Sequence, residues 1–97
     1  MMDKTLYLIN LYDYYEGLLT EKQREYFKNY YFENLSLSEI SENKDISRNA
    51  IHKVLKEAEN KLKYYEEILK LFEKSLMIKK LIKELDKDLK EKIEELI

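Results

Sequence analysis

The chain has 97 residues, enough for one domain with a modest core, and its net charge of −2 excludes a polycation that coats nucleic acid by charge alone. It contains no cysteine, which excludes disulfides, thiolate metal sites and cysteine nucleophiles and fits a reducing cytosol. No apolar run approaches the length of a membrane span, so we expect a cytoplasmic protein without a membrane-spanning segment.

Helix breakers are almost absent from the sequence. Proline does not occur and glycine occurs once, at Gly17, whereas a β-rich fold needs several turn formers. We therefore predict an all-α fold. Leu6, Ile9 and Tyr12 recur at helical spacing and predict a first helix over residues 3–16, which ends with Gly17 in a left-handed conformation.

Two capping boxes mark the next helix starts. Thr20 with Gln23 predicts a second helix that extends to about residue 32. Ser36 with Glu39 predicts a short third helix over residues 37–43.

Residues 36–56 have the pattern of a helix-turn-helix. Ser41 is the small residue that lets two helices cross closely, and Asp45 stands where the turn needs a left-handed residue. Ile46 is predicted to plug the space between the helices, and Ser47 to cap the fourth helix. The sequence therefore predicts a helix-turn-helix bundle.

The fourth helix is predicted to be long, with a heptad seam. Its apolar residues alternate spacings of four and three. They are Ile51, Leu55, Ala58, Leu62, Tyr65, Leu69, Phe72 and Leu76. A new apolar set begins at Ile78, which predicts a kink near Ser75, a helix-turn-helix domain over residues 1–75 and an amphipathic C-terminal helix over residues 76–97.

The second half of this seam is a predicted contact surface. Its residues are Leu62, Tyr65, Leu69, Phe72 and Leu76. They either pack antiparallel against the C-terminal helix of the same chain or pair two chains. We favour a homodimer, because a chain this short has little core to cover so long a helix.

Polar side chains point outward from the start of the fourth helix. They are Ser47, Arg48, Asn49, His52, Lys53 and Lys56. Arg48, Asn49 and His52 are side-chain types that read base edges, and Lys53 and Lys56 are suited to phosphates. Ser47 and the helix N-terminus would meet a further phosphate. The alternative is a bundle that only packs in this way, with lysines on an ordinary exposed face.

Other residue groups do not predict chemistry. His52 has no second histidine or cysteine to complete a zinc site. The pairs Tyr14–Tyr15, Tyr30–Tyr31 and Tyr64–Tyr65 are predicted to pack rather than to stack on bases. The carboxylate pairs Glu66–Glu67 and Glu94–Glu95 are predicted to be solvated. We therefore expect no enzyme, no cofactor, no metal and no small-molecule substrate.

The words LLTEKQ, YY, SLSEI and ISRNAI occur together and in this order from Leu18 onward. In this respect the chain resembles the YlxM family of small bacterial proteins. The resemblance implies a helix-turn-helix bundle of the winged-helix-like or sigma-factor region four type. It also implies a gene beside those of the signal recognition particle, a DNA-binding or regulatory role in that pathway, association with its GTPase, and no enzymatic activity.

Two hypotheses follow. The first is a DNA-binding helix-turn-helix regulatory protein associated with the signal recognition particle pathway. The alternative is a protein-interaction module that binds and modulates the GTPase or the particle without binding DNA. Asp45, Asn49 and Glu57 stand where the family commonly has glycine, glutamine and arginine. Glu57 places an anion on the predicted DNA face, which favours the alternative.

Overall fold

The structure, a computed structural model, describes residues 2–97, and these residues are helical with no strand. The six α-helices are α1 (Lys4–Tyr15), α2 (Glu21–Phe27), α3 (Leu37–Lys44), α4 (Arg48–Leu69), α5 (Leu71–Leu81) and α6 (Lys87–Glu94). A 3₁₀ turn, η1 (Glu16–Leu18), follows α1, and a π-helical turn, η2 (Lys28–Phe32), continues α2. The predicted all-α class is confirmed. These residues contain no strand, so they form no β wing.

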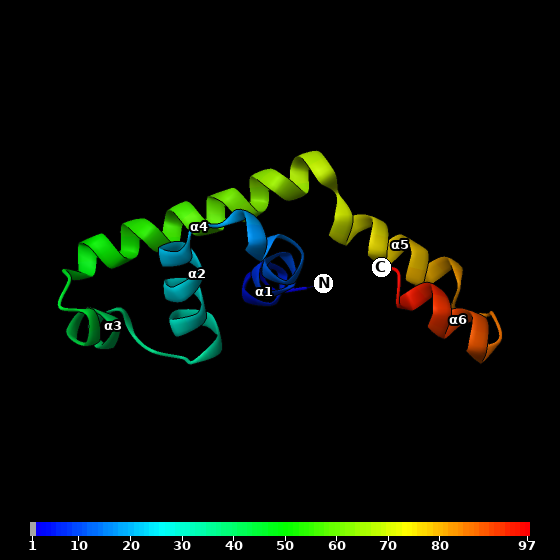
Figure 1. Cartoon of the computed structure of the whole chain (residues 1–97), viewed down its shortest axis with the longest axis horizontal. Coiled ribbons are helices and arrows are strands. Elements are labelled where there is room, and N and C mark those ends of the chain that lie inside the picture. Colours follow the sequence, from blue (N-terminus) through cyan, green and yellow to red (C-terminus); the bar gives the residue numbers. More distant parts are fainter. Residues whose placement is uncertain (1) are drawn as a thin grey trace.

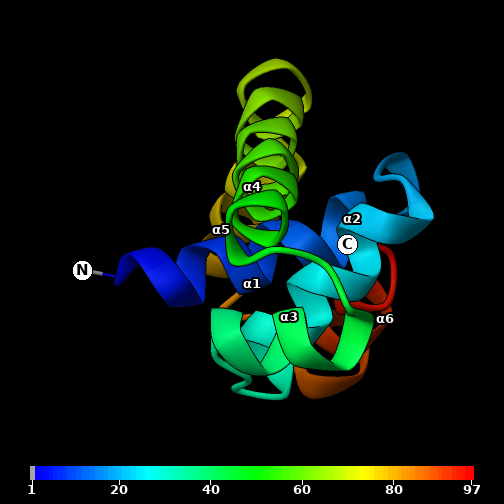
Figure 2. The ribbon, with the colours of Figure 1, turned by 90° about the vertical axis from the view of Figure 1, so that its left-hand side faces the viewer.

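The helices form a body and a projecting arm (Figure 1). In both ribbon views α1, α2 and α3 lie on the same side of α4 (Figure 2). The body comprises residues 2–69, and the arm, residues 71–97, consists of α5 and α6. The radius of gyration is 16.4 Å, against roughly 13 Å for a compact domain of 100 residues. The chain is therefore elongated, because the arm extends away from the body. No helix among residues 2–97 is both long and apolar enough to cross a lipid bilayer.

The predicted caps are confirmed. Thr20 Oγ1 accepts from the Gln23 amide at 3.1 Å, and Gln23 Oε1 accepts from the Thr20 amide at 3.0 Å. Ser36 and Glu39 form the second reciprocal pair at the start of α3. Each pair satisfies two backbone donors that a helix start leaves without partners.

The prediction that Gly17 ends the first helix in a left-handed conformation is wrong. Gly17 does not have a positive φ but lies within η1, and the chain leaves this turn at Leu19 in an extended conformation. Among residues 2–97 the left-handed residues are Asn34, Asp45 and Lys70. The 3₁₀ turn provides the tighter ending that a left-handed glycine would otherwise supply.

Two hydrophobic clusters fill the body, and α4 contributes to both. The larger cluster joins α1, α2, α4 and α5 through Leu8, Leu11, Tyr12, Tyr15, Leu19, Phe27, Ala58, Leu62 and Phe72. Its centre is the stacked pair Tyr12 and Phe27, whose ring centroids are 4.7 Å apart. The smaller cluster joins α2, α3 and α4 through Tyr26, Ile40, Ile51 and Leu55. The first half of the predicted seam is thus the buried side of α4.

The long fourth helix is confirmed, but the predicted break near Ser75 is wrong. The helix ends at Leu69, and Lys70 takes the left-handed conformation with φ 55°. Ser75 is buried inside α5, so the predicted boundary between residues 75 and 76 falls within a continuous helix. Residue 1 of the predicted first domain lies outside the described residues. The predicted helix over residues 76–97 is interrupted, because α5 ends at Leu81 and Asp86 caps a new helix, α6.

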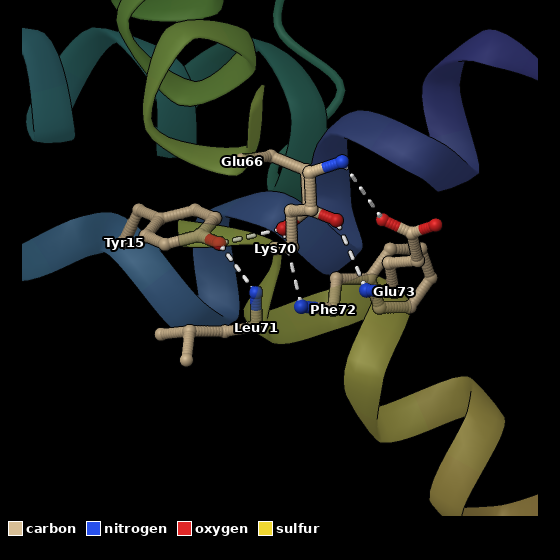
Figure 3. A network of polar contacts seen from close by, with 6 residues as sticks. All are labelled: Tyr15, Glu66, Lys70, Leu71, Phe72 and Glu73. Atoms are coloured by element: carbon tan, nitrogen blue, oxygen red, sulfur yellow. Dashed lines mark hydrogen bonds and ion pairs between the residues drawn. The ribbon is translucent and has the colours of Figure 1, made fainter. Parts of the chain in front are cut away.

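Glu66 explains why the chain breaks at Lys70 (Figure 3). Its Oε1 accepts from the Tyr15 hydroxyl at 2.5 Å and from the Phe72 amide at 3.1 Å, and its Oε2 accepts from the Glu73 amide at 3.0 Å. The Leu71 amide donates to the Tyr15 hydroxyl oxygen at 3.0 Å. Three amides of the first turn of α5 therefore find acceptors. The prediction that Glu66 is solvated is wrong: the residue is 7% exposed.

Some residues of the predicted tyrosine pairs and of the second half of the seam are buried, and others are exposed. Tyr15 is buried and Tyr14, Tyr31 and Tyr65 pack against the larger cluster, as predicted, whereas Tyr30 and Tyr64 are exposed. Of the seam residues, Leu62 and Phe72 are buried in the core, Tyr65 packs against it, and Leu69 and Leu76 are exposed. Leu62 and Phe72 therefore pack within the chain.

Replacing Tyr15 by phenylalanine should destabilise the fold. The substitution keeps the ring but leaves the Leu71 amide without its acceptor and Glu66 without one donor. We expect the free energy of unfolding at pH 7 to fall by about 1–3 kcal/mol, measured by urea denaturation. Tyr64→Phe, at an exposed tyrosine, is the control and should change little. Equal stability of Tyr15→Phe and the original chain would contradict a structural role for this hydroxyl.

The same variant should respond differently to alkaline pH. Burial, and then the hydrogen bond to the Glu66 carboxylate, raise the pKa of Tyr15 from 10.0 to about 12. The unfolded chain releases this proton at lower pH than the folded chain, so the contribution of Tyr15 is complete below pH 10 and decreases toward pH 12. The stability difference between the original chain and Tyr15→Phe should narrow over this range.

Candidate nucleic-acid interface

The helix-turn-helix is formed by α3, a tight turn and the first turns of α4. Asp45 adopts φ 54° and ψ 46°, the left-handed conformation that its position requires. The Ile46 amide donates to the Ser41 carbonyl at 3.2 Å, and the Ser41 hydroxyl donates to the Ile46 carbonyl. Ser41 thus allows the close crossing and also fixes the turn. The predicted turn geometry is confirmed.

Apolar contacts beneath the turn set the angle of α4. Ile40 from α3 and Ile51 from α4 are fully buried, and Ile46 packs against them from the turn. Ile46 therefore occupies the predicted position between the two helices. With the inner side of α4 buried in this way, its opposite side is left to solvent.

Ser47 caps α4, as predicted. Its hydroxyl accepts from the Ala50 amide at 3.2 Å. The first amides of a helix have no partner within it, so those of Arg48 and Asn49 point out from the end of α4. This end can therefore receive an anion through backbone donors and the helix dipole.

The structure brings the six predicted DNA-binding residues together at the start of α4. All are exposed: Ser47, Arg48, Asn49, His52, Lys53 and Lys56. The spacing of four between Asn49 and Lys53 and between His52 and Lys56 places each pair one turn apart on the same side. The first two turns of α4 therefore present a continuous polar surface, which we call the α4 face.

Lys56 differs from the other cations of this face. Its ammonium nitrogen is 3.3 Å from Glu59 Oε1, and Glu59 is only 5% exposed. The Tyr31 hydroxyl donates to Glu59 Oε2 at 2.6 Å. Burial and this hydrogen bond raise the pKa of Tyr31 well above its ordinary value. Glu59 thus holds the Lys56 ammonium group toward the body. Arg48 and Lys53 form no ion pair among residues 2–97, so they are the cations of this face that can contact an external anion.

A groove beside the α4 face was not predicted from the sequence. It has a volume of about 230 Å³ and lies between α1, η2, α3 and α4. Lys4 and Thr5 line it from α1, opposite His52 and Lys56 from α4. Lys4 lies almost fifty residues from His52 in the sequence, and no local pattern links them. The groove places a further cation beside the predicted interface.

Glu57 is the exposed acid nearest in sequence to these cations. It lies four residues after Lys53, one turn along α4. Glu59, by contrast, is buried and already bonded to Lys56 and Tyr31. The ion pair of Lys56 with Glu59 balances one positive charge with one negative charge, so Glu57 remains the exposed acid beside the unpaired cations of this face.

Replacing Asp45 by glycine should stabilise the turn. Asp45 has a left-handed backbone, which an L-residue with a side chain adopts at a cost that glycine avoids. We expect the free energy of unfolding to rise by roughly 0.5–1 kcal/mol, measured by urea denaturation. Asp13→Gly is the matched control: it removes the same charge from an exposed position inside α1 and should lower stability. A loss of stability in Asp45→Gly would show that the aspartate side chain itself supports the turn.

Comparison with known proteins agrees with this geometry. A family model described as "Putative helix-turn-helix protein, YlxM / p13 like" matches residues 2–97. A UPF0122 protein of Caldanaerobacter subterraneus is 50% identical over 84 residues, which cover 86% of this chain and 72% of that relative. A UPF0122 protein of Shouchella clausii is 45% identical over 87 residues, covering 90% and 80%. One of Ureaplasma parvum is 51% identical over 73 residues, covering 75% and 74%. The chain therefore belongs to the YlxM/p13-like helix-turn-helix family.

Proposed function

We propose that the protein is a cytoplasmic, non-enzymatic DNA-binding regulator that acts as a homodimer. The observation that carries this proposal is the α4 face: a helix start with free amides and exposed Arg48, Asn49 and Lys53, held by an intact helix-turn-helix. Recognition helices of this class enter the major groove with their N-terminal residues against base edges.

Each side chain of the α4 face has a role in this proposal. Arg48 suits a bidentate contact with guanine, and Asn49 suits one with adenine. His52 reaches a neighbouring base edge or sugar. Lys53 and Lys56 contact phosphates, and the capped end of α4 at Ser47 meets another phosphate through its amides.

The number of phosphate contacts per chain argues for two chains. A single α4 face supplies few cations, and Glu57 opposes them. Affinity for DNA grows with the number of phosphates neutralised, so one copy gives weak binding. Two copies joined by a two-fold axis would address half-sites about one helical turn apart.

The double variant Arg48→Ala, Lys53→Ala should weaken DNA binding. The test is a fluorescence-anisotropy titration of random-sequence duplex over a series of salt concentrations. If both cations contact phosphates, the slope of log affinity against log salt should decrease by about one per cation removed from each chain. If Arg48 instead reads a base, its loss should relax the preference among specific sites.

The matched control is Lys22→Ala with Lys28→Ala. It removes the same charge from exposed residues of α2 and η2, away from the α4 face. We expect it to preserve most of the affinity and the salt slope. Equal losses in both double variants would mean that charge alone, and not the α4 face, carries the binding. Absence of binding by the original chain at low salt would reject the proposal.

The second candidate is a protein-interaction module for the GTPase of the signal recognition particle. The observation in its favour is a pair of exposed aromatic side chains at the end of the α2–η2 segment, Tyr30 at 38% and Phe32 at 46% exposed. Exposed aromatic residues are enriched at protein interfaces. In this role the helix-turn-helix would hold η2 in place rather than bind DNA.

Calorimetric titration with the purified GTPase tests this candidate. Binding should produce heat and alter GTP turnover, and Tyr30→Ala should weaken it about tenfold or more if Tyr30 anchors the contact. Tyr64→Ala, at another exposed tyrosine on α4, serves as the control. The candidate is rejected if the original chain gives neither heat nor a change in turnover.

A further inference from the structure

The arm exposes an unusual amount of apolar surface. Its two helices and the segments around α6 leave seven large apolar side chains at least 40% exposed: Leu71, Leu76, Met77, Leu81, Leu85, Leu89 and Leu96. Two of them, Leu81 at 79% and Leu96 at 84%, have almost no cover from their own chain. Scattered apolar residues are normal on a surface, but a concentration of this kind marks an interaction site.

Helix α6 has little support from its own chain. It spans only Lys87–Glu94, and none of its residues is buried. Helices of this length are marginal in water unless an apolar face packs on something else. Leu89 and Ile93 recur on one face of α6 at a spacing of four, with Leu85 one turn before them. Ile93 is half-buried by its own chain, whereas Leu85 and Leu89 are exposed, so part of that face is left for a partner from outside the chain.

The charges of the arm indicate what that partner is. Lys79, Lys80 and Lys83 lie at the C-terminal end of α5, and Glu91, Glu94 and Glu95 lie at the C-terminal end of α6. Among residues 2–97 the ion pairs are Lys44–Glu25, Lys56–Glu59 and Lys70–Glu73, so none of these six charges is paired. Acids also lie beside these lysines, and lysines lie among these glutamates: residues 79–88 hold four lysines and three acids, and residues 89–97 hold two lysines and three glutamates. The arm thus carries a weakly basic end and a weakly acidic end that complement each other.

We propose that the partner is a second copy of this chain, bound arm to arm. A two-fold axis perpendicular to the helices sets α5 of one copy parallel to the partner's α6, so the basic end of one meets the acidic end of the other. The same arrangement covers the apolar faces in a four-helix packing. This inference rests on the proposed homodimer and locates its interface in the arm rather than in the predicted seam, in which Leu62 and Phe72 are already buried.

The size of the arm is adequate for this role. Residues 71–97 match the roughly 20–30 residues that each side of a standard interface contributes. The network of Glu66 and Tyr15 fixes the start of α5 to the body. Pairing of two arms therefore also fixes the distance between the two α4 faces.

The first experiment compares two pairs of substitutions by analytical ultracentrifugation. Leu81→Glu with Leu89→Glu places four carboxylates in the proposed dimer interface, and we expect the dissociation constant to rise by about 100-fold or more. Leu6→Glu with Leu18→Glu makes the same change at exposed leucines of the body, both about as exposed as Leu89, and should leave the dimer intact. Circular dichroism checks that both variants keep their helices.

The second experiment exchanges charges. One variant carries Lys79→Glu, Lys80→Glu and Lys83→Glu, and the other carries Glu91→Lys, Glu94→Lys and Glu95→Lys. Each alone should dimerise about tenfold more weakly, because like charges meet across the interface. An equimolar mixture should recover the original affinity, since each arm then faces its complement. Failure of the mixture to recover it would overturn the proposed arrangement.

Measurements of the oligomer mass and of DNA binding together distinguish a failure of the arm interface from a failure of the proposed function. A wild-type chain that stays monomeric at about 100 µM, a hundred times a micromolar dissociation constant, overturns the homodimer and leaves the arm to another protein. A dimer that the arm variants do not dissociate overturns the arm interface alone. A dimer that they dissociate supports the inference even if no DNA is bound. A monomeric arm variant that still binds DNA weakly, with a smaller salt slope, supports both.

Discussion

The buried side of α4 is the constraint on which the rest of the structure depends. Helices α1, α2, α3 and α5 all pack on it, and both hydrophobic clusters include its residues. A single helix of this length can serve two clusters because its apolar residues stay on one side through four turns and more. The opposite side is left uncovered, and its first two turns form the α4 face. Core and candidate interface are thus two sides of one helix.

Buried carboxylates connect the body to the segments that lie beyond the core. Glu66 accepts from α1 and from the first turn of α5, so it joins three helices at one side chain. Glu59 connects Tyr31 of η2 with Lys56 at the edge of the α4 face. A buried charge is tolerated only when its oxygens are hydrogen-bonded, and both glutamates meet that condition. These contacts make the orientation of the arm and the position of Lys56 properties of the folded body.

Much of the fold and of the candidate site could be predicted from the sequence. The capping residues Thr20, Ser36 and Ser47 each act on the amide three positions away, so their patterns are complete in the sequence itself. The turn at Asp45 also depends on residues close in sequence, because Ser41 and Ile46 close it. Local periodicity also identified the exposed residues of the α4 face, because a helix buries one side and exposes the other. The break at Lys70 could not be predicted in this way, since heptad spacing continues through it to Phe72 and Leu76.

The sequence by itself therefore determined the helices of the body, their starts and the residues that α4 presents to solvent, because each depends on contacts within about one helical turn. Only the tertiary structure decided where α4 ends and how the arm leaves the body. Tyr15 and Glu66 are 51 positions apart, and their hydrogen bond exists only once α1 has packed on α4. The groove with Lys4 opposite His52 has the same origin. Local patterns carry no information on such pairs, because packing of distant segments creates them.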